Sequence, residues 1–331
     1  MADGSSIAAS GPLGGRSDQV GLFGFSRPQA LAFLVMLAAI VALPFAVYPF
    51  FLMKLLCFAL FACAFNLLIG YAGLLSFGHA AYFGMGAYVS GYASKAWGVT
   101  PEIAIIMGGL TGMALGLPFG WLAIRRTGIY FAMITLALAQ MVYFFCVQAP
   151  FTGGEDGIQS IPRGRLFGVI DLTEDFAMYW VVAGVFVIGF LLIHRIVHSP
   201  FGQVLKAIRD NEPRATSLGY RTDDYKLLAF VLSAGIAGLA GGTKAIAVKL
   251  ATLTDVLWTM SGEVVLMSLV GGLGTVFGPV VGAGTIVTMQ TYLAEFGAWV
   301  LVIQGVIFIA CVLAFRRGIL GEIANMLRVR L

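Results

Sequence analysis

The polar side chains within the apolar segments are the groups through which this 331-residue chain could do chemistry, and they are few. They comprise Asn66, Ser76, His79, Gln140, Gln290 and Gln304, with Lys54, Lys244 and Lys249 nearer the segment ends. Polar groups are costly in hydrocarbon, so each should face another helix or a polar pathway. We expect interhelical hydrogen bonds from Asn66 and Gln304, and a pathway position for His79, which follows a glycine-rich break. The three lysines can extend to an interface without any functional role.

The patterns that common enzymes and nucleotide-binding proteins need are missing from the sequence. Its three histidines form no His-Glu-x-x-His pattern, and no serine stands in a nucleophile elbow. The stretch "GLAGGTK", residues 238–244, lacks the Gly-Lys-Ser/Thr order of a phosphate loop and lies late in an apolar run. We therefore predict no catalytic, metal or cofactor site. A buried proton relay is disfavoured because the nearby acids fall in loops or at segment edges, namely Glu102, Glu155, Asp156, Asp255, Glu263 and Glu295.

The composition identifies the bilayer as the main surroundings of the chain. Hydrophobic residues make up 60% of it and charged residues 11%, with a mean hydropathy of +0.94. The net charge of +4 comes from basic residues spread over short loops, so we predict no nucleic-acid partner. The cysteines lie in apolar runs, and we interpret each as a small buried hydrophobe: Cys57, Cys63, Cys146 and Cys311.

The predicted fold is all-α, a polytopic transmembrane helical bundle with about 8–10 spans, including broken or re-entrant helices. The predicted spans cover residues 29–48, 50–69, 76–94, 103–124, 128–149, 178–195, 227–248, 263–293 and 297–315. Residues 1–27 are rich in Gly, Ser and Ala, and we expect a disordered leader there. A membrane domain over residues 28–316 and a cytoplasmic tail over residues 317–331 complete the predicted organisation.

Basic residues predict the orientation, because loops rich in Lys and Arg stay in the cytoplasm. They precede the first span, follow the fourth and sixth spans and follow the last one: Arg16, Arg27, Arg125, Arg126, the loop 195–226, Arg316, Arg317, Arg328 and Arg330. All of these share one side only if the chain turns back within residues 263–293. We predict a helical hairpin or re-entrant pair at "GGLGTVFGP", residues 271–279, with both termini cytoplasmic.

Two glycine-rich breaks and one polar loop are candidates for lining a solute pathway. The stretch "GLLSFG", residues 73–78, faintly resembles "GLGTVFG", residues 272–278, and paired glycine interruptions indicate the substrate path of a transporter. Close helix packing explains the same glycines equally well. The loop "FTGGEDGIQSIPRG", residues 151–164, is either a surface turn or the mouth of the pathway. The candidate pathway residues are Gly73, Ser76, Phe77, Gly78, His79, Thr152, Gly153, Gly154, Asp156, Gly157, Gly272 and Gly274.

A charged segment, "SPFGQVLKAIRDNEPRATSLGY" at residues 199–220, predicts a helical hairpin within the loop 196–226. Its first helix should start at Ser199-Pro200 and place Phe201, Leu205 and Ile208 on one apolar face. Asn211 is positioned to cap a second helix, which Gly219 ends. Charges of both signs suit a protein partner better than a lipid surface, so we expect the apolar face to enter a groove on that partner.

These segments together resemble the branched-chain amino-acid ABC transporter permeases. The similar stretches are "NLLIGYAGLLSFGHAAYFGMGAY" (residues 66–88), "FTGGEDGI" (151–158), the charged segment and "SLVGGLGTVFGPVVGA" (268–283), in the family's order. The long outer loop resembles that of the M-type subunit. The resemblance implies a non-enzymatic permease in the inner membrane of a bacterium, forming half of the pathway beside a second homologous permease subunit. Two cytoplasmic ATP-binding subunits would drive it, and a periplasmic substrate-binding protein would supply it.

The resemblance also assigns residues to functions. Those that match the loop patterns of the family, with their neighbours on the hairpin, are the predicted ATPase-coupling residues: Phe201, Gly202, Leu205, Ala207, Ile208, Arg209, Asp210, Asn211, Glu212, Ala215 and Gly219. An ion-coupled secondary carrier and a channel stay open as alternatives, although no charged ring or carbonyl filter is visible. Within the family, the residues do not choose between Leu, Ile and Val, other amino acids, and urea or short amides.

Overall fold

The computed structural model describes residues 27–168, 170–293, 299–314 and 318–326, and these are mostly helical. The α-helices are α1 (Arg27–Ala42), α2 (Pro49–Asn66), α3 (His79–Ala96), α4 (Pro101–Ala123), α5 (Ile129–Gln148), α6 (Asp175–His198), α7 (Pro200–Asp210), α8 (Glu212–Ser217), α9 (Thr222–Val248), α10 (Trp258–Gly271), α11 (Gly278–Leu293), α12 (Trp299–Ala314) and α13 (Gly318–Met326). Short helical turns are η2 (Leu43–Phe45), η3 (Leu67–Ala72), η4 (Pro150–Thr152), η5 (Gly154–Asp156) and η6 (Leu253–Asp255). Four two-residue strands form two antiparallel pairs: β1 (Ile158–Gln159) pairs with β4 (Leu250–Ala251), and β2 (Arg165–Leu166) pairs with β3 (Ile170–Asp171).

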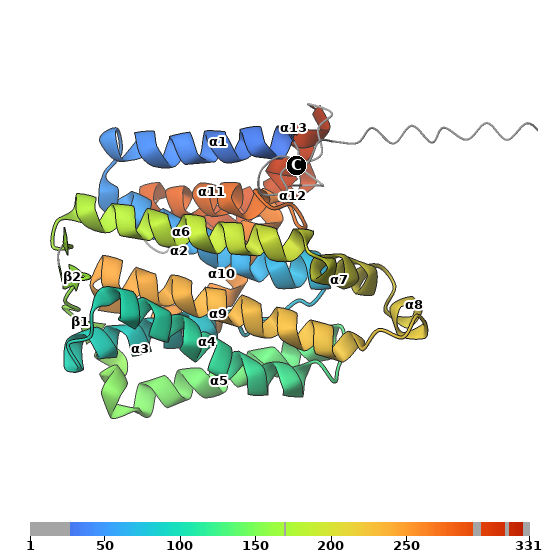
Figure 1. Ribbon diagram of the computed structural model, residues 1–331, viewed down its shortest axis with the longest axis horizontal. Coiled ribbons are helices and arrows are strands. Elements are labelled where there is room, and N and C mark those ends of the chain that lie inside the picture. Colours follow the sequence, from blue (N-terminus) through green and yellow to red (C-terminus); the bar gives the residue numbers. More distant parts are fainter. Residues whose placement is uncertain (1–26, 169, 294–298, 315–317, 327–331) are drawn as a thin grey trace, which may run out of the picture.

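The long helices run side by side as one bundle (Figure 1). Six helical segments of the described chain are long and apolar enough to cross a membrane: residues 28–45, 49–72, 101–123, 129–148, 175–198 and 222–248. The predicted all-α membrane bundle is therefore confirmed. The helices α3, α10, α11 and α12 are shorter or less apolar, with 14 to 18 residues each. The larger predicted number of spans, about 8–10, stays a prediction.

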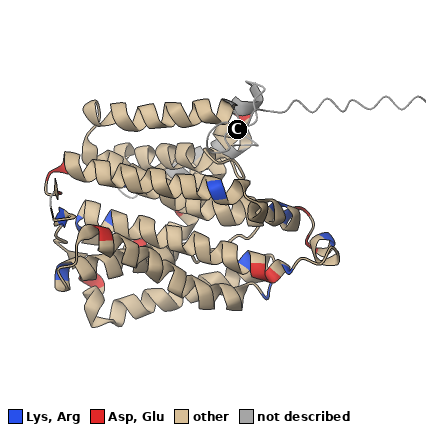
Figure 2. Ribbon diagram, viewed as in Figure 1, with Lys and Arg blue, Asp and Glu red and all other residues tan. Residues whose placement is uncertain are grey.

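The bundle has two distinct ends, toward which most of the charged residues gather (Figure 2). We call the end that carries α7, α8 and the start of α9 the hairpin end, and the end that carries the strands the loop end (Figure 1). The start of α1 and α13 both lie at the hairpin end (Figure 1). The predicted disordered leader, residues 1–27, falls on residues 1–26 except for Arg27 and so lies outside the described ranges, whereas most of the predicted tail, residues 317–331, is described as α13. The side of the membrane on which the termini lie stays a prediction.

The predicted break at residues 271–279 separates two helices, α10 and α11, as expected for a hairpin within the apolar stretch 263–293. Gly272 ends α10 with a φ of 118°, a conformation that side chains with a Cβ rarely adopt. Pro279 occupies the first turn of α11, where a proline does not cost a helical hydrogen bond. The two helices pack against each other and against α2.

Close backbone contacts between α3, α4 and α9 hold the other half of the bundle together. A Cβ on Gly112 would lie 2.2 Å from the backbone oxygen of Ala234, and one on Gly86 would lie 2.3 Å from that of Gly238. Small residues allow such approach, which is a main source of helix association in lipid. Close helix packing therefore explains the glycines at these positions without a role in a solute pathway.

Replacing Gly241 with Ala should lower the melting temperature of the purified protein. A Cβ on Gly241 in α9 would lie 1.8 Å from the backbone oxygen of Phe83 in α3, so the helices would have to separate, at a cost of about 1–3 kcal/mol. Gly184→Ala in α6 is the matched control, because no atom lies within 4 Å of its Cβ position. There alanine should stabilise the helix by about 1 kcal/mol. Equal melting temperatures in a thermal-shift measurement would contradict the packing argument.

Candidate functional site

The charged segment 199–220 folds into the two predicted helices at the hairpin end. Ser199 Oγ accepts a hydrogen bond from the backbone nitrogen of Gly202 at 3.4 Å, and Asn211 Oδ1 accepts one from that of Arg214 at 3.0 Å. These caps begin α7 and α8, and Gly219, with a φ of 89°, follows the end of α8 as predicted. An ion pair between Glu212 and Lys226 connects α8 to the first turns of α9.

The chain itself covers most of the apolar face of α7, so Leu205 and Ile208 are not available for the contact expected with a partner, while the coupling role of the hairpin stays a prediction. Leu205 and Ile208 are 0% and 2% exposed, and Phe201 stacks on Tyr225 of α9 with ring centroids 5.6 Å apart. The face packs against α6, η3 and α9, because burial within the chain removes its apolar surface from water. The exposed residues of α7 are Pro200 at its start and the polar or small residues Gln203, Ala207, Arg209 and Asp210.

Arg209 connects α7 to both glycine-rich breaks. Its Nη1 donates a hydrogen bond of 2.5 Å to the backbone oxygen of Gly70 in η3. A Cβ on Gly73 would lie 2.9 Å from Arg209 Cγ, and one on Gly274 would lie 3.5 Å from Arg209 Nη1. Gly73 and Gly274 have φ values of 73° and 74°, so the backbone conformation favours glycine at both, and the space available also favours it at Gly73. We call Gly70, Gly73, Arg209 and Gly274 the hairpin junction.

Asn66 holds the two breaks against each other. Its Nδ2 donates a hydrogen bond to the backbone oxygen of Thr275 at 2.8 Å, and its Oδ1 accepts one from the backbone nitrogen of Gly274 at 3.1 Å. Asn66 thus forms long-range hydrogen bonds as expected, but its partners lie in the turn between α10 and α11 and not in a helix. The side chain of Gln304 lies outside the described part. The π-helical turn η3 follows Asn66 directly, and such turns are frequent at functional sites.

The predicted pathway residues fall into three separate groups. Gly73, Gly272 and Gly274 lie at or beside the hairpin junction, and residues 152–157 lie at the loop end. The group between them, Ser76 to His79, packs among the helices: Phe77 donates its backbone N–H to Thr135 Oγ1 at 3.1 Å. Gly78 donates to Ser76 Oγ at 3.2 Å.

His79 is fully buried in an aromatic cluster. Its Nε2 lies 2.8 Å from Ser233 Oγ, which donates to the backbone oxygen of Ala64 at 2.5 Å. The rings of Phe65, Tyr82 and Phe230 surround the imidazole. The contacts connect α2, α3 and α9, so they give His79 an interhelical role; its predicted place in a pathway stays a prediction.

The outer loop is built from well-defined contacts. Thr152 Oγ1 donates to the backbone oxygens of Cys146 and Ala149 at 2.5 and 2.6 Å. Gly153, Gly154 and Gly157 have φ values of 77°, 61° and 69°. A Cβ on Gly157 would lie 2.3 Å from the backbone oxygen of Ala251, where β1 pairs with β4. Glu155 and Asp156 are exposed beside this glycine-shaped turn.

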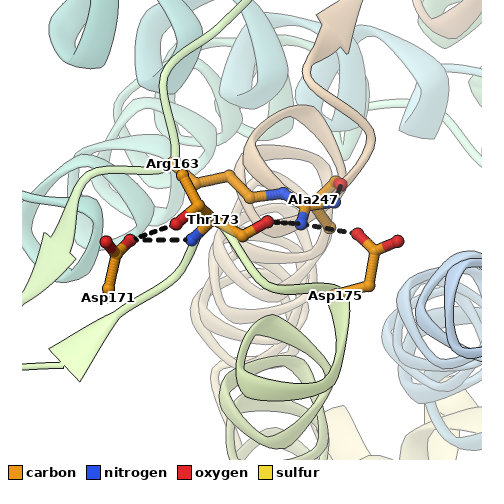
Figure 3. A network of polar contacts seen from close by, with 5 residues as sticks. All are labelled: Arg163, Asp171, Thr173, Asp175 and Ala247. Atoms are coloured by element: carbon orange, nitrogen blue, oxygen red, sulfur yellow. Dashed lines mark hydrogen bonds and ion pairs between the residues drawn. The ribbon is translucent and has the colours of Figure 1, made fainter.

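Arg163 fastens the outer loop to the bundle, a role that the sequence did not suggest (Figure 3). It is 3% exposed, and its Nη1 forms an ion pair of 2.6 Å with Asp175 at the start of α6. Its Nη2 donates to the backbone oxygen of Ala247 in α9 at 2.7 Å. In the same loop, hydrogen bonds from the side chain and backbone of Thr173 lower the pKa of Asp171. The sequence around Arg163, a polar loop, does not indicate that Asp175 and Ala247 are its partners.

The surroundings of two charged residues near the loop end differ from those predicted from the sequence. Lys244, which was expected to extend to an interface, forms a 2.6 Å ion pair with Asp255, and their side chains are 8% and 3% exposed. Glu263, expected at a span edge, lies in the second turn of α10. The three described cysteine side chains, Cys57, Cys63 and Cys146, are free and buried as predicted.

Comparison with known proteins gives the family. The model described as "Branched-chain amino acid transport system / permease component" matches residues 47–312. The high-affinity branched-chain amino acid transport system permease protein LivM of Salmonella typhimurium is 25% identical over 288 residues, which cover 80% of this chain and 68% of the relative, and LivM of Escherichia coli gives the same values. The autoinducer 2 import system permease protein LsrC of Salmonella typhi is 29% identical over 186 residues, 54% of this chain and 50% of the relative. No solved structure matches significantly. Because the family model covers most of the chain, the protein belongs to the branched-chain amino acid transport permease family, whose members are non-catalytic membrane subunits of ABC transporters.

Proposed function

We propose that this chain forms half of the pathway of an ATP-driven importer for branched-chain or related amino acids. A second homologous permease subunit would form the other half, and two cytoplasmic ATP-binding subunits and a periplasmic binding protein would complete the assembly. The observation that carries the proposal is the hairpin junction. Through Arg209 and Gly70, a movement of α7 would reach η3 and the turn between α10 and α11.

The surface offered to an ATP-binding subunit is the part of α7 that carries Gln203, Ala207 and Asp210, with the groove beside it. The groove has a volume of about 520 Å³ and is lined by Pro200, Phe201, Val204, Tyr220, Asp224, Tyr225 and Leu228. Leu218 is 72% exposed at the tip of the hairpin. A rigid hairpin that buries one face in its own bundle and leaves the other exposed is suited to pass on a partner's movement.

Reconstitution in proteoliposomes tests the proposal. We expect uptake of radiolabelled L-leucine only when the chain is combined with the second permease, the ATP-binding subunits, the binding protein and ATP. Leucine uptake by the chain alone would support a carrier or a channel instead. ATP-dependent uptake of urea or acetamide without leucine uptake would replace the proposed substrate while keeping the transporter class.

The glycines of the outer loop should be needed for uptake. In the double variant Gly153→Val and Gly154→Val, we expect uptake to fall several-fold with membrane insertion unchanged. Each valine would be held at positive φ at a cost of about 1–3 kcal/mol, and a Cβ at position 153 would also lie 2.4 Å from the backbone oxygen of Gly157. Gly168→Val is the matched control, since Gly168 also has a positive φ, of 74°, but no atom lies within 4 Å of its Cβ position. Equal uptake by the two variants would make residues 153–157 an ordinary turn.

Both termini should lie in the cytoplasm. The hairpin formed by α10 and α11 returns the chain to the loop end before α12, so α13 follows at the hairpin end, beside the basic loops (Figure 1). We expect a reporter fused after Asn325 to be active only if it functions in the cytoplasm. Activity of a periplasm-specific reporter at that position would contradict the orientation.

A further inference from the structure

Two residues of opposite charge, Lys54 and Glu263, lie within helices near the loop end, apart from the hairpin and the outer loop. Lys54 is the sixth residue of α2, and Glu263 is the sixth residue of α10. Both helices start at the loop end (Figure 1), so at a rise of about 1.5 Å per residue the two lie at a similar depth. Charged side chains within membrane helices are costly, and they mark binding sites and pathways.

Two pairs of opposite charge meet in this region, and they differ in character. Lys244 and Asp255 are closed on each other at 2.6 Å and buried. Lys54 and Glu263 lie close enough to interact electrostatically, yet neither forms an ion pair with any residue of the described ranges. Both are half-buried. A purely structural pair would be expected to close as its neighbour does, because two unpaired charges are poorly solvated at this depth.

The surroundings of the open pair supply polar and apolar groups together. The side-chain amide of Gln290 in α11 lies near the carboxylate of Glu263. Lys54 Nζ lies 6.0 Å from the ring centroid of Phe58, one turn further along α2. Trp258 is 44% exposed at the start of α10. The helices α2, α10 and α11, which carry these groups, pack together.

We infer that Lys54 and Glu263 form a binding subsite for the zwitterionic head of an amino acid. The Lys54 ammonium group would bind the α-carboxylate, and the Glu263 carboxylate, oriented by Gln290, would bind the α-ammonium group. A zwitterion matches two opposite charges that lie beyond ion-pair distance of each other, and it satisfies both at once. An uncharged solute would leave both unpaired, so the subsite selects zwitterions over neutral amides or sugars. This inference rests on the proposed function as an amino-acid importer.

Uptake of radiolabelled L-leucine by the assembled transporter in proteoliposomes tests the subsite. We expect Lys54→Met and Glu263→Gln each to reduce uptake at least about tenfold, while both variants still co-purify with the ATP-binding subunits. Lys54→Arg and Glu263→Asp keep the charges and should retain most of the uptake. Lys249→Met is the control, because it removes an exposed charge at the same end of the bundle. If Lys54→Met does not assemble, Lys54→Gln carries the same test.

The double variant Lys54→Met with Glu263→Gln separates binding from structure. If the two charges only balance each other, removing both should restore uptake lost in the single variants. If they hold the two ends of a zwitterion, the double variant should be at least as defective as either single variant. Restored uptake, or wild-type uptake in the single variants, would overturn the subsite while leaving the importer intact. A wild-type transporter that moves no leucine would instead refute the proposed function.

Discussion

Arg209→Met is expected to abolish the coupling between ATP hydrolysis and uptake. The variant loses the hydrogen bond from Nη1 to Gly70, which as a bond to a charged donor contributes about 1.5–3 kcal/mol. It also loses the guanidinium group that lies beside Gly274. Uptake should fall at least about tenfold, because α7 no longer moves together with the two glycine-rich breaks. The ATP-binding subunits should stay bound and continue to hydrolyse ATP.

The measurement compares hydrolysis and uptake in the same proteoliposomes. Arg195→Met is the matched control, since Arg195 is an exposed arginine in the last turn of α6, next along the chain to the hairpin. If the variant lost ATPase binding as well as uptake, Arg209 would act in docking the ATP-binding subunit and not in coupling through the hairpin junction. Unchanged uptake would show that the contact with Gly70 carries no coupling.

Ala207→Glu is expected to abolish uptake by a different route, the loss of ATPase association. Ala207 is exposed on α7, on the face opposite to the buried Leu205 and Ile208, so the substitution should leave folding and insertion intact. It places a bulky carboxylate next to Asp210 at the centre of the proposed docking surface, where crowding and a repulsive charge oppose binding. Uptake should therefore fall to background.

Co-purification of the tagged permease with its ATP-binding subunits, beside uptake in the same membranes, checks this prediction. Ala207→Ser is the control, because it changes neither charge nor size appreciably and should retain both activities. If Ala207→Glu kept full ATPase binding and transport, the exposed face of α7 would not be a docking surface. The hairpin would then be an amphipathic element that rests on the inner leaflet.

The helical spans were predictable because the bilayer dictates their length and composition. The predicted span 103–124 corresponds to α4 (Pro101–Ala123), and 128–149 corresponds to α5 (Ile129–Gln148). The hairpin of α10 and α11 followed from combining the positions of arginines with a run of glycines. The caps at Ser199 and Asn211 were equally accessible, because capping depends on residues within one turn of each other.

Contacts between distant segments were not predictable from one sequence. Arg209 and Gly70 are 139 residues apart, and Arg163 and Ala247 are 84 residues apart. Nothing in the local pattern of either arginine names its backbone partner. The apolar face of α7 shows the same limit in another form. Periodicity established that Leu205 and Ile208 would be buried, but it could not tell burial in the chain's own bundle from burial in a partner.

The placement of α2 at the centre of the bundle has a consequence for biogenesis. Within the described chain, α2 packs against α6, α9, α10 and α11, all of which are synthesised after it. Asn66 and its partner Thr275 are 209 residues apart, so at about 5–20 residues per second their syntheses are separated by roughly 10–40 s. During that time the segment Pro49–Ala72, with a mean hydropathy of 2.3, is stable in lipid, but the side-chain amide of Asn66 lacks its final hydrogen-bond partner. The second helix to be made is thus among the last to acquire its neighbours, and assembly of the bundle is completed only after α11 has entered the membrane.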